Sequence, residues 1–255
     1  MTDLATLDTT AGIARIAINR PDKRNAMNAD VRHALMAAFE AALADDAVRA
    51  IVLAGNGGTF CAGGDIASME GLNARTARAR MKDNHKLVRL IAEAEKPVVA
   101  AVEGFAVGAG AGLALLADTI IAADGATIGF PFFRVGLIPD YALLFTLPRR
   151  VGDAAARQML LYARNYDARS AVAIGLADEF AEKGEAELRA QERAAALAAM
   201  PPHAFAIAKR QLGLWPTSLE AALEMEAMGQ ALSFNTDEHA EGRAAFREKR
   251  APKFR

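Results

Sequence analysis

Cysteine and histidine are scarce in this chain of 255 residues, and their scarcity excludes several kinds of site. The single cysteine, Cys61, excludes an internal disulfide and any metal cluster built from cysteines. The four histidines show no spacing typical of metal ligands or of a Ser-His-Asp arrangement. The sequence therefore predicts no metal site. The histidines are His33, His85, His203 and His239.

An excess of charge of either sign is also missing. Lys and Arg number 30 and Asp and Glu number 31, which gives a net charge of −1. Nucleic acids and anionic membranes attract strongly basic surfaces, so this balance favours neither partner. The opening MTDLATLDTT contains no basic segment followed by an apolar run, so no signal peptide is visible and we expect a cytoplasmic protein.

No apolar run is continuous enough to read as a membrane span. The best candidate, residues 98–117, contains Glu103 and is broken by four glycines. A buried strand, a glycine turn and a buried helix explain this segment better. We therefore expect no association with a membrane.

Strand and helix patterns alternate through the first half of the chain. Apolar alternation predicts strands around residues 12–18, and apolar residues four apart predict a helix after Asn28 that ends near Ala44. Further patterns predict strands at 50–54, 98–102 and 119–123 and helices at 75–95, 113–116 and 219–232, the last opened by a capping box at 217–220. After Pro148 the pattern is almost wholly helical.

This order of elements predicts a layered α/β core with a helical C-terminal part. The chain contains no low-complexity linker and no clear repeat period. One continuous fold is therefore expected in preference to two independent domains.

Two glycine-rich turns carry the strongest signal for chemistry. One, FCAGGDI at 60–66, follows a buried strand, and the other, GFAVGAG at 104–110, lies between a strand and a helix. Small residues let the backbone approach a ligand, and the start of a helix leaves N–H groups unpaired. Two such turns facing one point would form an oxyanion hole, whereas either one alone is more simply a tight turn.

Together with other segments, these turns resemble the crotonase (enoyl-CoA hydratase/isomerase) family in order and spacing. The segments are NRPDKRNAM at 19–27, FCAGGDI at 60–66, GFAVGAG at 104–110, VGLIP at 135–139, the stretch 168–178 and EGRAAFREKRAPKFR at 241–255. The resemblance covers nearly the whole chain. It implies a crotonase-like spiral of ββα units over residues 1–198 and a helical trimerisation region over residues 199–255, in a homotrimer or a dimer of trimers.

The resemblance also implies a site for an acyl-CoA substrate, with coenzyme A as part of the substrate and no separate cofactor. The backbone N–H groups of Gly64 and Ala109 would form the oxyanion hole for the thioester carbonyl. The positions implied to bind CoA are Arg24, Ala26, Ala62, Asp65 and Ile66, and those implied to reach the CoA of a neighbouring subunit are Phe246 and Lys249. From spacing alone, the last two would be a helix-packing phenyl ring and a solvated charge.

The sequence departs from the family pattern at the positions that move protons in hydratases. Hydratases of the family hold water between two glutamates, and the matching residues here are Gly112 and Phe132. Neither residue can transfer a proton, so ordinary hydration is not favoured. One carboxylate remains, Asp140, at a position that matches the catalytic aspartate of dienoyl-CoA and epoxyphenylacetyl-CoA isomerases.

Asp140 is therefore the predicted catalytic base. Aromatic residues around Phe132 indicate an apolar acyl pocket, in which a carboxylate should have a raised pKa. The alternative is that Asp140 merely caps the helix that follows it. We expect an isomerase in which Asp140 moves a proton between two carbons of the acyl chain. A hydratase with another acid and a CoA-thioester-binding protein without turnover are the alternatives.

Overall fold

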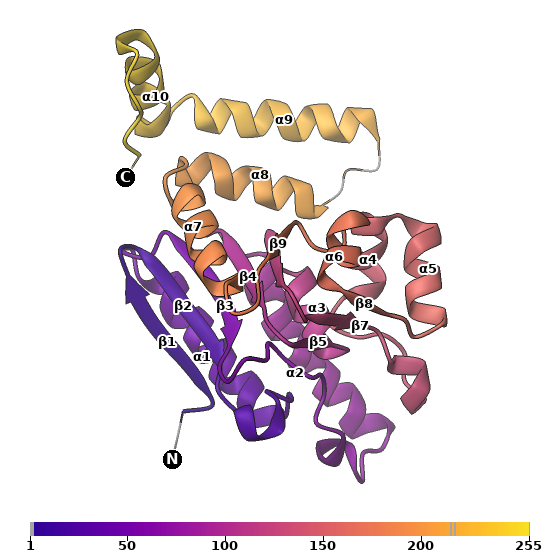
Figure 1. Ribbon diagram of the computed structural model, residues 1–255. Helices are drawn as coiled ribbons and strands as arrows, with labels where there is room; N and C mark the ends of the chain where they lie inside the picture. Colours follow the sequence, from indigo (N-terminus) through magenta and orange to yellow (C-terminus); the bar gives the residue numbers. More distant parts are fainter. Residues whose placement is uncertain (1–2, 215, 217, 255) are drawn as a thin grey trace.

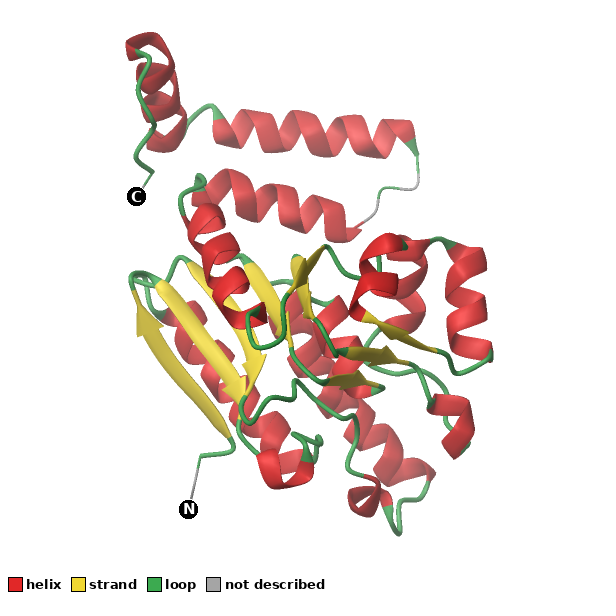
Figure 2. Ribbon diagram, in the orientation of Figure 1, coloured by secondary structure: helices red, strands yellow, loops and turns green. Residues whose placement is uncertain are grey.

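The computed structural model describes residues 3–214, 216 and 218–254, and it builds the body of the protein from two sheets covered by helices (Figures 1 and 2). The first two strands of the larger sheet pair antiparallel, and its remaining neighbours pair parallel. In order across this sheet the strands are β1 (Ala5–Thr10), β2 (Ile13–Ile18), β3 (Ala50–Gly55), β4 (Val98–Val102), β6 (Thr119–Ala123) and β9 (Glu179–Ala181).

Both faces of the larger sheet are buried. On β3, Ile51 and Leu53 belong to the core that also contains side chains of α1 (Ala29–Ala44), α2 (Ala74–Ala92) and α3 (Ala109–Leu115). Val52 points to the opposite face, which is covered by α7 (Ala186–Ala198). A parallel strand buried on both faces is apolar at every position, which is why residues 50–54 and 98–102 read as continuous apolar runs.

The first helix begins and packs as its sequence pattern predicted. The side-chain oxygen of Asn28 accepts a hydrogen bond of 2.9 Å from the backbone N–H of Val31, which satisfies one of the unpaired donors at the helix start. Val31, Leu35 and Phe39 repeat every four residues on one face, and all three are fully buried. The prediction of this helix is confirmed.

A smaller sheet gives the fold its repeated ββα pattern. It contains β5 (Phe105–Val107), β7 (Thr127–Gly129) and β8 (Asn165–Asp167). In the middle of the chain a strand of the larger sheet is followed by one of the smaller sheet and then by a helix, as in β4, β5 and α3. The predicted spiral of ββα units is therefore confirmed, and β5 places the start of α3 beside the turn at residues 60–66.

The prediction of an almost wholly helical chain after Pro148 is wrong. β8 and β9 lie in that region, among α4 (Leu143–Val151), α5 (Asp153–Leu161) and α6 (Ala168–Ala173). Both strands are three residues long, too short for side-chain alternation to be visible. Backbone pairing with β7 and with β6, rather than a local pattern, makes them strands.

The C-terminal helices are α8 (Pro202–Leu214), α9 (Leu219–Ser233) and α10 (Asp237–Glu248), and α9 and α10 stand away from the sheets (Figure 1). Lys209 of α8 forms an ion pair of 2.7 Å with Asp118 of the body. Thr217 of the predicted capping box lies outside the described residues, and the hydroxyl of Ser218 accepts the N–H of Ala221 at the start of α9.

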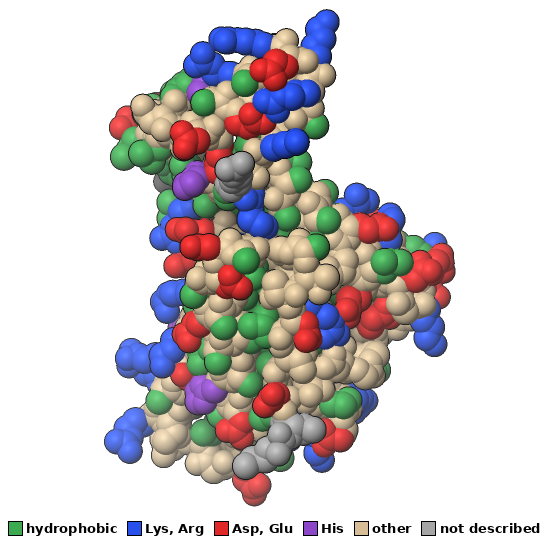
Figure 3. Space-filling model, turned by 90° about the vertical axis from the view of Figure 1, so that its left-hand side faces the viewer, with side chains coloured by type: hydrophobic (Ala, Val, Ile, Leu, Met, Phe, Trp, Pro, Cys, Tyr) green, Lys and Arg blue, Asp and Glu red, His purple; other side chains and the backbone are tan. Residues whose placement is uncertain are grey.

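Large apolar side chains are exposed along these C-terminal helices. The predicted boundary between the core and a trimerisation region after residue 198 stays a prediction, as does trimerisation itself. Phe246, with 86% of its surface exposed, is the most exposed large apolar residue described. The others on this part of the chain are Leu212, Leu214, Leu219, Leu223, Met228, Leu232 and Phe234. Basic and acidic side chains are interspersed on the face shown in Figure 3. Of the helices described, none is both long and apolar enough to cross a membrane.

We predict that Gly110→Ala destabilises the protein by about 1–3 kcal/mol, the usual penalty for overpacking a well-packed site. A Cβ atom at this position would lie 2.2 Å from the carbonyl oxygen of Cys61, so α3 would have to move away from the turn. Urea unfolding measures the change. Gly213→Ala in α8 is the matched control, because a Cβ there meets nothing within 4 Å. Equal stability of the two variants would contradict the prediction.

Candidate active site

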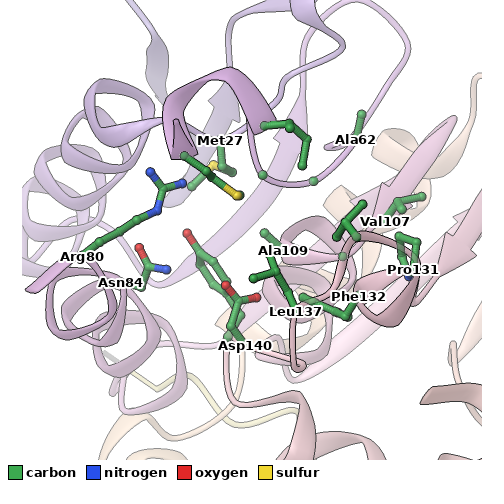
Figure 4. A pocket seen from close by; sticks show the side chains of 17 residues that line it. Met27, Ala62, Arg80, Asn84, Val107, Ala109, Pro131, Phe132, Leu137 and Asp140 are labelled. Atoms are coloured by element: carbon green, nitrogen blue, oxygen red, sulfur yellow. The ribbon is translucent and has the colours of Figure 1, made fainter. Parts of the chain in front are cut away.

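A pocket of about 230 Å³ lies between α2, the turn before η2 (Ile66–Met69) and the start of α3 (Figure 4). Most of its lining is apolar or backbone. The polar side chains in the lining are Arg80, Asn84, Asp140 and Tyr141, and the other lining residues are Met27, Ala62, Gly63, Gly64, Ile66, Met69, Val107, Gly108, Ala109, Pro131, Phe132, Val135 and Leu137.

Backbone hydrogen bonds hold the turn at residues 61–65 between two neighbours. On one side, the N–H of Cys61 donates to Phe105 at 2.7 Å and its carbonyl accepts from Val107 at 3.0 Å. On the other side, Met27 donates to the carbonyl of Gly63 at 2.8 Å, and Asp65 donates to Met27 at 2.9 Å. The turn is therefore fixed both to β5 and to the segment before α1.

These bonds leave the amides of Gly64 and Ala109 available. Successive peptide groups of an extended segment point to opposite sides, so the N–H of Gly64 points away from Met27. Ala109 is the first residue of α3, where no intrahelical acceptor exists. Neither amide has a hydrogen-bond partner among the described residues, and both residues line the same pocket. Two such donors can hold one carbonyl oxygen, as an oxyanion hole does.

Tyr141 fills the space beside Gly112. The backbone at Tyr141 and Ala142 is left-handed, with φ of 49° and 60°. A Cβ atom on Gly112 would lie only 2.4 Å from the Cβ of Tyr141. The position that the family resemblance gives to a hydratase glutamate therefore has no room for any side chain while Tyr141 stays in place.

Asp140 has a partly buried carboxyl group, and one of its oxygens lacks a protein partner among the described residues. Its Oδ1 atom is inaccessible to solvent and has no hydrogen bond among the described residues. Burial raises the pKa of Asp140 to about 6, although the nearby charge of Arg80 acts to lower it. The helix that follows has Ala142 as its N-cap and no side-chain cap, so the interpretation of Asp140 as a helix cap is wrong.

Tyr141 also has an unpartnered polar atom in the pocket. The residue is 2% exposed, and its hydroxyl has no hydrogen bond to the described residues. Burial raises the pKa of the phenol well above its usual range. The hydroxyl therefore stays protonated at neutral pH and can donate a hydrogen bond.

The residues predicted to bind CoA are only partly brought together. Ala62 and Ile66 line the pocket, whereas Arg24, Ala26 and Asp65 do not. The backbone N–H of Ala62 donates to the carbonyl of Arg24 at 3.0 Å, which keeps the exposed Arg24 near the rim. Asp65 forms an ion pair of 2.7 Å with Arg20, and that hydrogen bond lowers the pKa of Asp65.

The remaining predicted residues lie at very different places. Phe132 is 7% exposed and lines the pocket, as expected for an apolar acyl site. Phe246 and Lys249 lie at the end of α10 and do not line this pocket. Their predicted role at a neighbouring subunit's site stays a prediction.

Sequence reasoning missed two polar residues of the pocket, Arg80 and Asn84. Both lie on α2, where polar residues surround a narrow apolar stripe. The sequence predicts that such residues lie on the solvent-exposed face of the helix. Nothing in the local sequence distinguishes Arg80 and Asn84 from their exposed neighbours.

Together, an α/β spiral, two unpartnered amides and a partly buried carboxyl form an arrangement that can polarise a carbonyl group and move a proton near it. A family model described as enoyl-CoA hydratase/isomerase matches residues 8–255. The chain belongs to this family, as its motifs predicted.

Similar proteins carry names from both halves of the family's description. A Rhodobacter capsulatus protein named "Probable enoyl-CoA hydratase" is 41% identical over 247 residues, which cover 95% of this chain and 94% of that one. The 1,2-epoxyphenylacetyl-CoA isomerase of Escherichia coli is 32% identical over 95% of each chain. A crystal structure of an enoyl-CoA hydratase from Polaromonas matches with a TM-score of 0.93, 30% identity and coverage of 98% of this chain and 99% of that one.

We predict that the conflict between positions 112 and 141 appears as coupling in a double-mutant cycle. Gly112→Ala should destabilise the protein by about 1–3 kcal/mol, because its Cβ overlaps that of Tyr141. In a Tyr141→Gly background, which removes that atom and suits a positive φ, the penalty should fall to less than half. Urea unfolding of the four proteins measures the coupling. Additive effects would show that Tyr141 does not restrict position 112.

Proposed function

We propose that the protein is an isomerase that moves a carbon–carbon double bond in an unsaturated acyl-CoA thioester. The observation that carries this proposal is a partly buried carboxyl group, with one oxygen that has no partner among the described residues, in the same pocket as two unpartnered backbone amides. Such a pocket has the two parts that the reaction needs, a group that takes a proton and a place for the resulting negative charge.

The amides of Gly64 and Ala109 hold the thioester oxygen in the proposed reaction. Removal of a proton from the carbon next to the thioester places negative charge on this oxygen. Donors fixed in advance at that point stabilise the charge more than they stabilise the neutral thioester. Their positions are set by backbone hydrogen bonds, so the site does not have to reorganise as the charge forms.

Asp140 transfers the proton. As a carboxylate it takes the proton from the carbon next to the thioester, and as a carboxylic acid it returns the proton two carbons further along the chain. The electron pair of the broken C–H bond becomes the new double bond, and the old double bond supplies the electrons of the new C–H bond. One base is enough for this transfer, which fits the presence of one carboxyl group in the pocket lining.

The CoA part is proposed to leave the pocket past Ala62 and Ile66. Ile66 is 60% exposed, and Arg24 provides a positive charge near that rim for phosphate groups. Phe246 and Lys249 are proposed to contact the CoA of a neighbouring subunit in a homotrimer or a dimer of trimers. The exposed apolar side chains of α8, α9 and α10 support self-association through this part of the chain. The reaction needs no cofactor other than the CoA of the substrate.

Hydration is the second candidate, because several relatives carry hydratase names. Addition of water needs a group that activates the water as well as one that protonates carbon. The two-glutamate arrangement is not favoured, because position 112 has no space for a side chain and position 132 carries a phenyl ring. Hydration would have to use Asp140 with another group of the pocket.

We predict that Asp140→Asn lowers the rate of double-bond migration in 3-enoyl-CoA esters by about 10²–10⁴, because the amide cannot accept the proton. Formation of the conjugated thioester is followed by its ultraviolet absorbance. Glu70→Gln is the matched control, since Glu70 is exposed next to η2 and does not line the pocket.

The same assay separates the two candidate reactions. Crotonyl-CoA should lose its conjugated absorbance slowly or not at all in the presence of the wild-type protein. Rapid loss with 3-hydroxybutanoyl-CoA as the product would favour the hydratase instead. Full isomerase activity in Asp140→Asn would rule out Asp140 as the base.

We also predict the pH dependence of the isomerase. Because burial raises the pKa of Asp140 to about 6, kcat/KM should rise as the pH increases through about 6 and level off above it, where the carboxylate form dominates. Arg80→Met should move this midpoint to higher pH, because the charge of Arg80 lowers the pKa of Asp140. A midpoint near the ordinary pKa of an aspartate, unmoved in the variant, would contradict the assignment.

A further inference from the structure

We propose that the pocket selects an acyl group that carries a hydroxyl, an uncharged oxygen function, at its end away from the thioester. The observation is a set of three polar side chains, Arg80, Asn84 and Tyr141, in a lining that is otherwise mostly apolar. This inference rests on the proposed binding of an acyl-CoA ester, and it adds the chemical class of the acyl group.

Arg80 has N–H donors that form no hydrogen bond within the described part of the protein. Its Nη1 atom donates to the carbonyl oxygen of Ser68 at 3.2 Å and to the hydroxyl of Ser68 at 3.1 Å. Arg80 forms no other hydrogen bond to the described residues. None of the carboxylates among those residues forms a salt bridge with it. A guanidinium carries five N–H donors, so donors remain for an oxygen of the ligand.

Asn84 and Tyr141 are buried with polar atoms that lack protein partners. Each residue is 2% exposed. The Oδ1 atom of Asn84 and the hydroxyl of Tyr141 have no hydrogen bonds to the described residues within normal geometry. The nearby Arg32 acts to lower the pKa of Tyr141, which burial raises. Leaving a buried polar group unpaired costs roughly 1–3 kcal/mol, so a ligand group that pairs either atom gains binding free energy.

The side chains of Arg80 and Asn84 lie where the far end of an acyl chain would be. In Figure 4, Arg80 and Asn84 extend from α2 on one side of the pocket, and Ala62, Val107 and Pro131 lie on the opposite side. Ala109 and Asp140 lie between these two sides. An acyl-CoA that enters past Ala62 and places its carbonyl at Ala109 therefore directs the rest of its chain toward Arg80 and Asn84.

The oxygen function is assigned as uncharged because Asp140 lies near enough to Arg80 for their charges to interact. The charge of Arg80 already acts on Asp140, as the effect on the pKa of that carboxyl shows. A second carboxylate, brought in by the substrate, would be repelled by ionised Asp140 in a poorly solvated space. A hydroxyl can accept a hydrogen bond from Arg80 and donate one to the Oδ1 atom of Asn84 without that repulsion.

Binding of saturated acyl-CoA esters tests the inference without any catalytic step. Calorimetry compares 5-hydroxypentanoyl-, 6-hydroxyhexanoyl- and 7-hydroxyheptanoyl-CoA with hexanoyl-, heptanoyl- and octanoyl-CoA, in which a methyl group replaces the hydroxyl. At the chain length that reaches Arg80, the hydroxylated ester should bind about tenfold more tightly or better, the effect expected for a hydrogen bond to a charged group. Adipoyl-CoA, with a terminal carboxylate, should bind more weakly than that ester.

Three variants identify the groups responsible. Arg80→Met and Asn84→Leu should each remove most of the preference for the hydroxyl and still bind the methyl-ended esters, which shows that they fold. Arg78→Met is the control, because Arg78 is an exposed residue of the same helix that does not line the pocket. This variant should keep the preference of the wild-type protein.

The possible results are distinct. No preference at any chain length, or a preference that survives in both Arg80→Met and Asn84→Leu, overturns the inference and leaves the proposed isomerase untouched. Tighter binding of adipoyl-CoA overturns the assignment of an uncharged group. Failure of every CoA ester to bind contradicts the proposed function itself, and the inference with it.

Discussion

The site depends on the close approach of two backbone segments, the turn at residues 61–65 and the start of α3. Cys61 forms backbone hydrogen bonds with both Phe105 and Val107, which ties the turn to the strand that leads into α3. Gly110 allows the approach, since any side chain there would collide with the carbonyl of Cys61. Because both segments are held by backbone bonds, the positions of the two amides are fixed before a ligand binds.

Burial then gives the pocket its chemistry. The absence of a side chain at Gly112 makes room for Tyr141, and the left-handed backbone there turns the chain so that Asp140 and Tyr141 both line the pocket. The same removal from water that raises the pKa of Asp140 leaves its Oδ1 atom without a partner. A group of this kind gains from a ligand in two ways, since the ligand both excludes water and supplies the missing contact.

The sequence predicts those parts of the protein that rest on local rules. The apolar period of the first helix and the apolar runs of β3 and β4 were accessible from the pattern of residues, whereas Gly64 and Ala109 were singled out only by the family resemblance. The sequence showed that Gly112 departs from the family pattern. It did not show that Tyr141 fills the space beside Gly112, because the two residues meet only in the folded chain. Arg80, Asn84 and the short strands β8 and β9 were missed for the same reason, as tertiary contacts alone distinguish them.

The two neighbouring titratable groups of the pocket are suited to different tasks. Burial brings the pKa of Asp140 to about 6, so this group changes its charge near neutral pH, whereas burial moves the pKa of Tyr141 further above that range. Near neutral pH, Asp140 is therefore suited to accept and return a proton, whereas Tyr141 stays protonated and is limited to hydrogen bonding. A pocket with one proton-exchanging group suits a reaction in which the same base removes and returns a proton. It suits the addition of water less well, because that reaction needs two such groups.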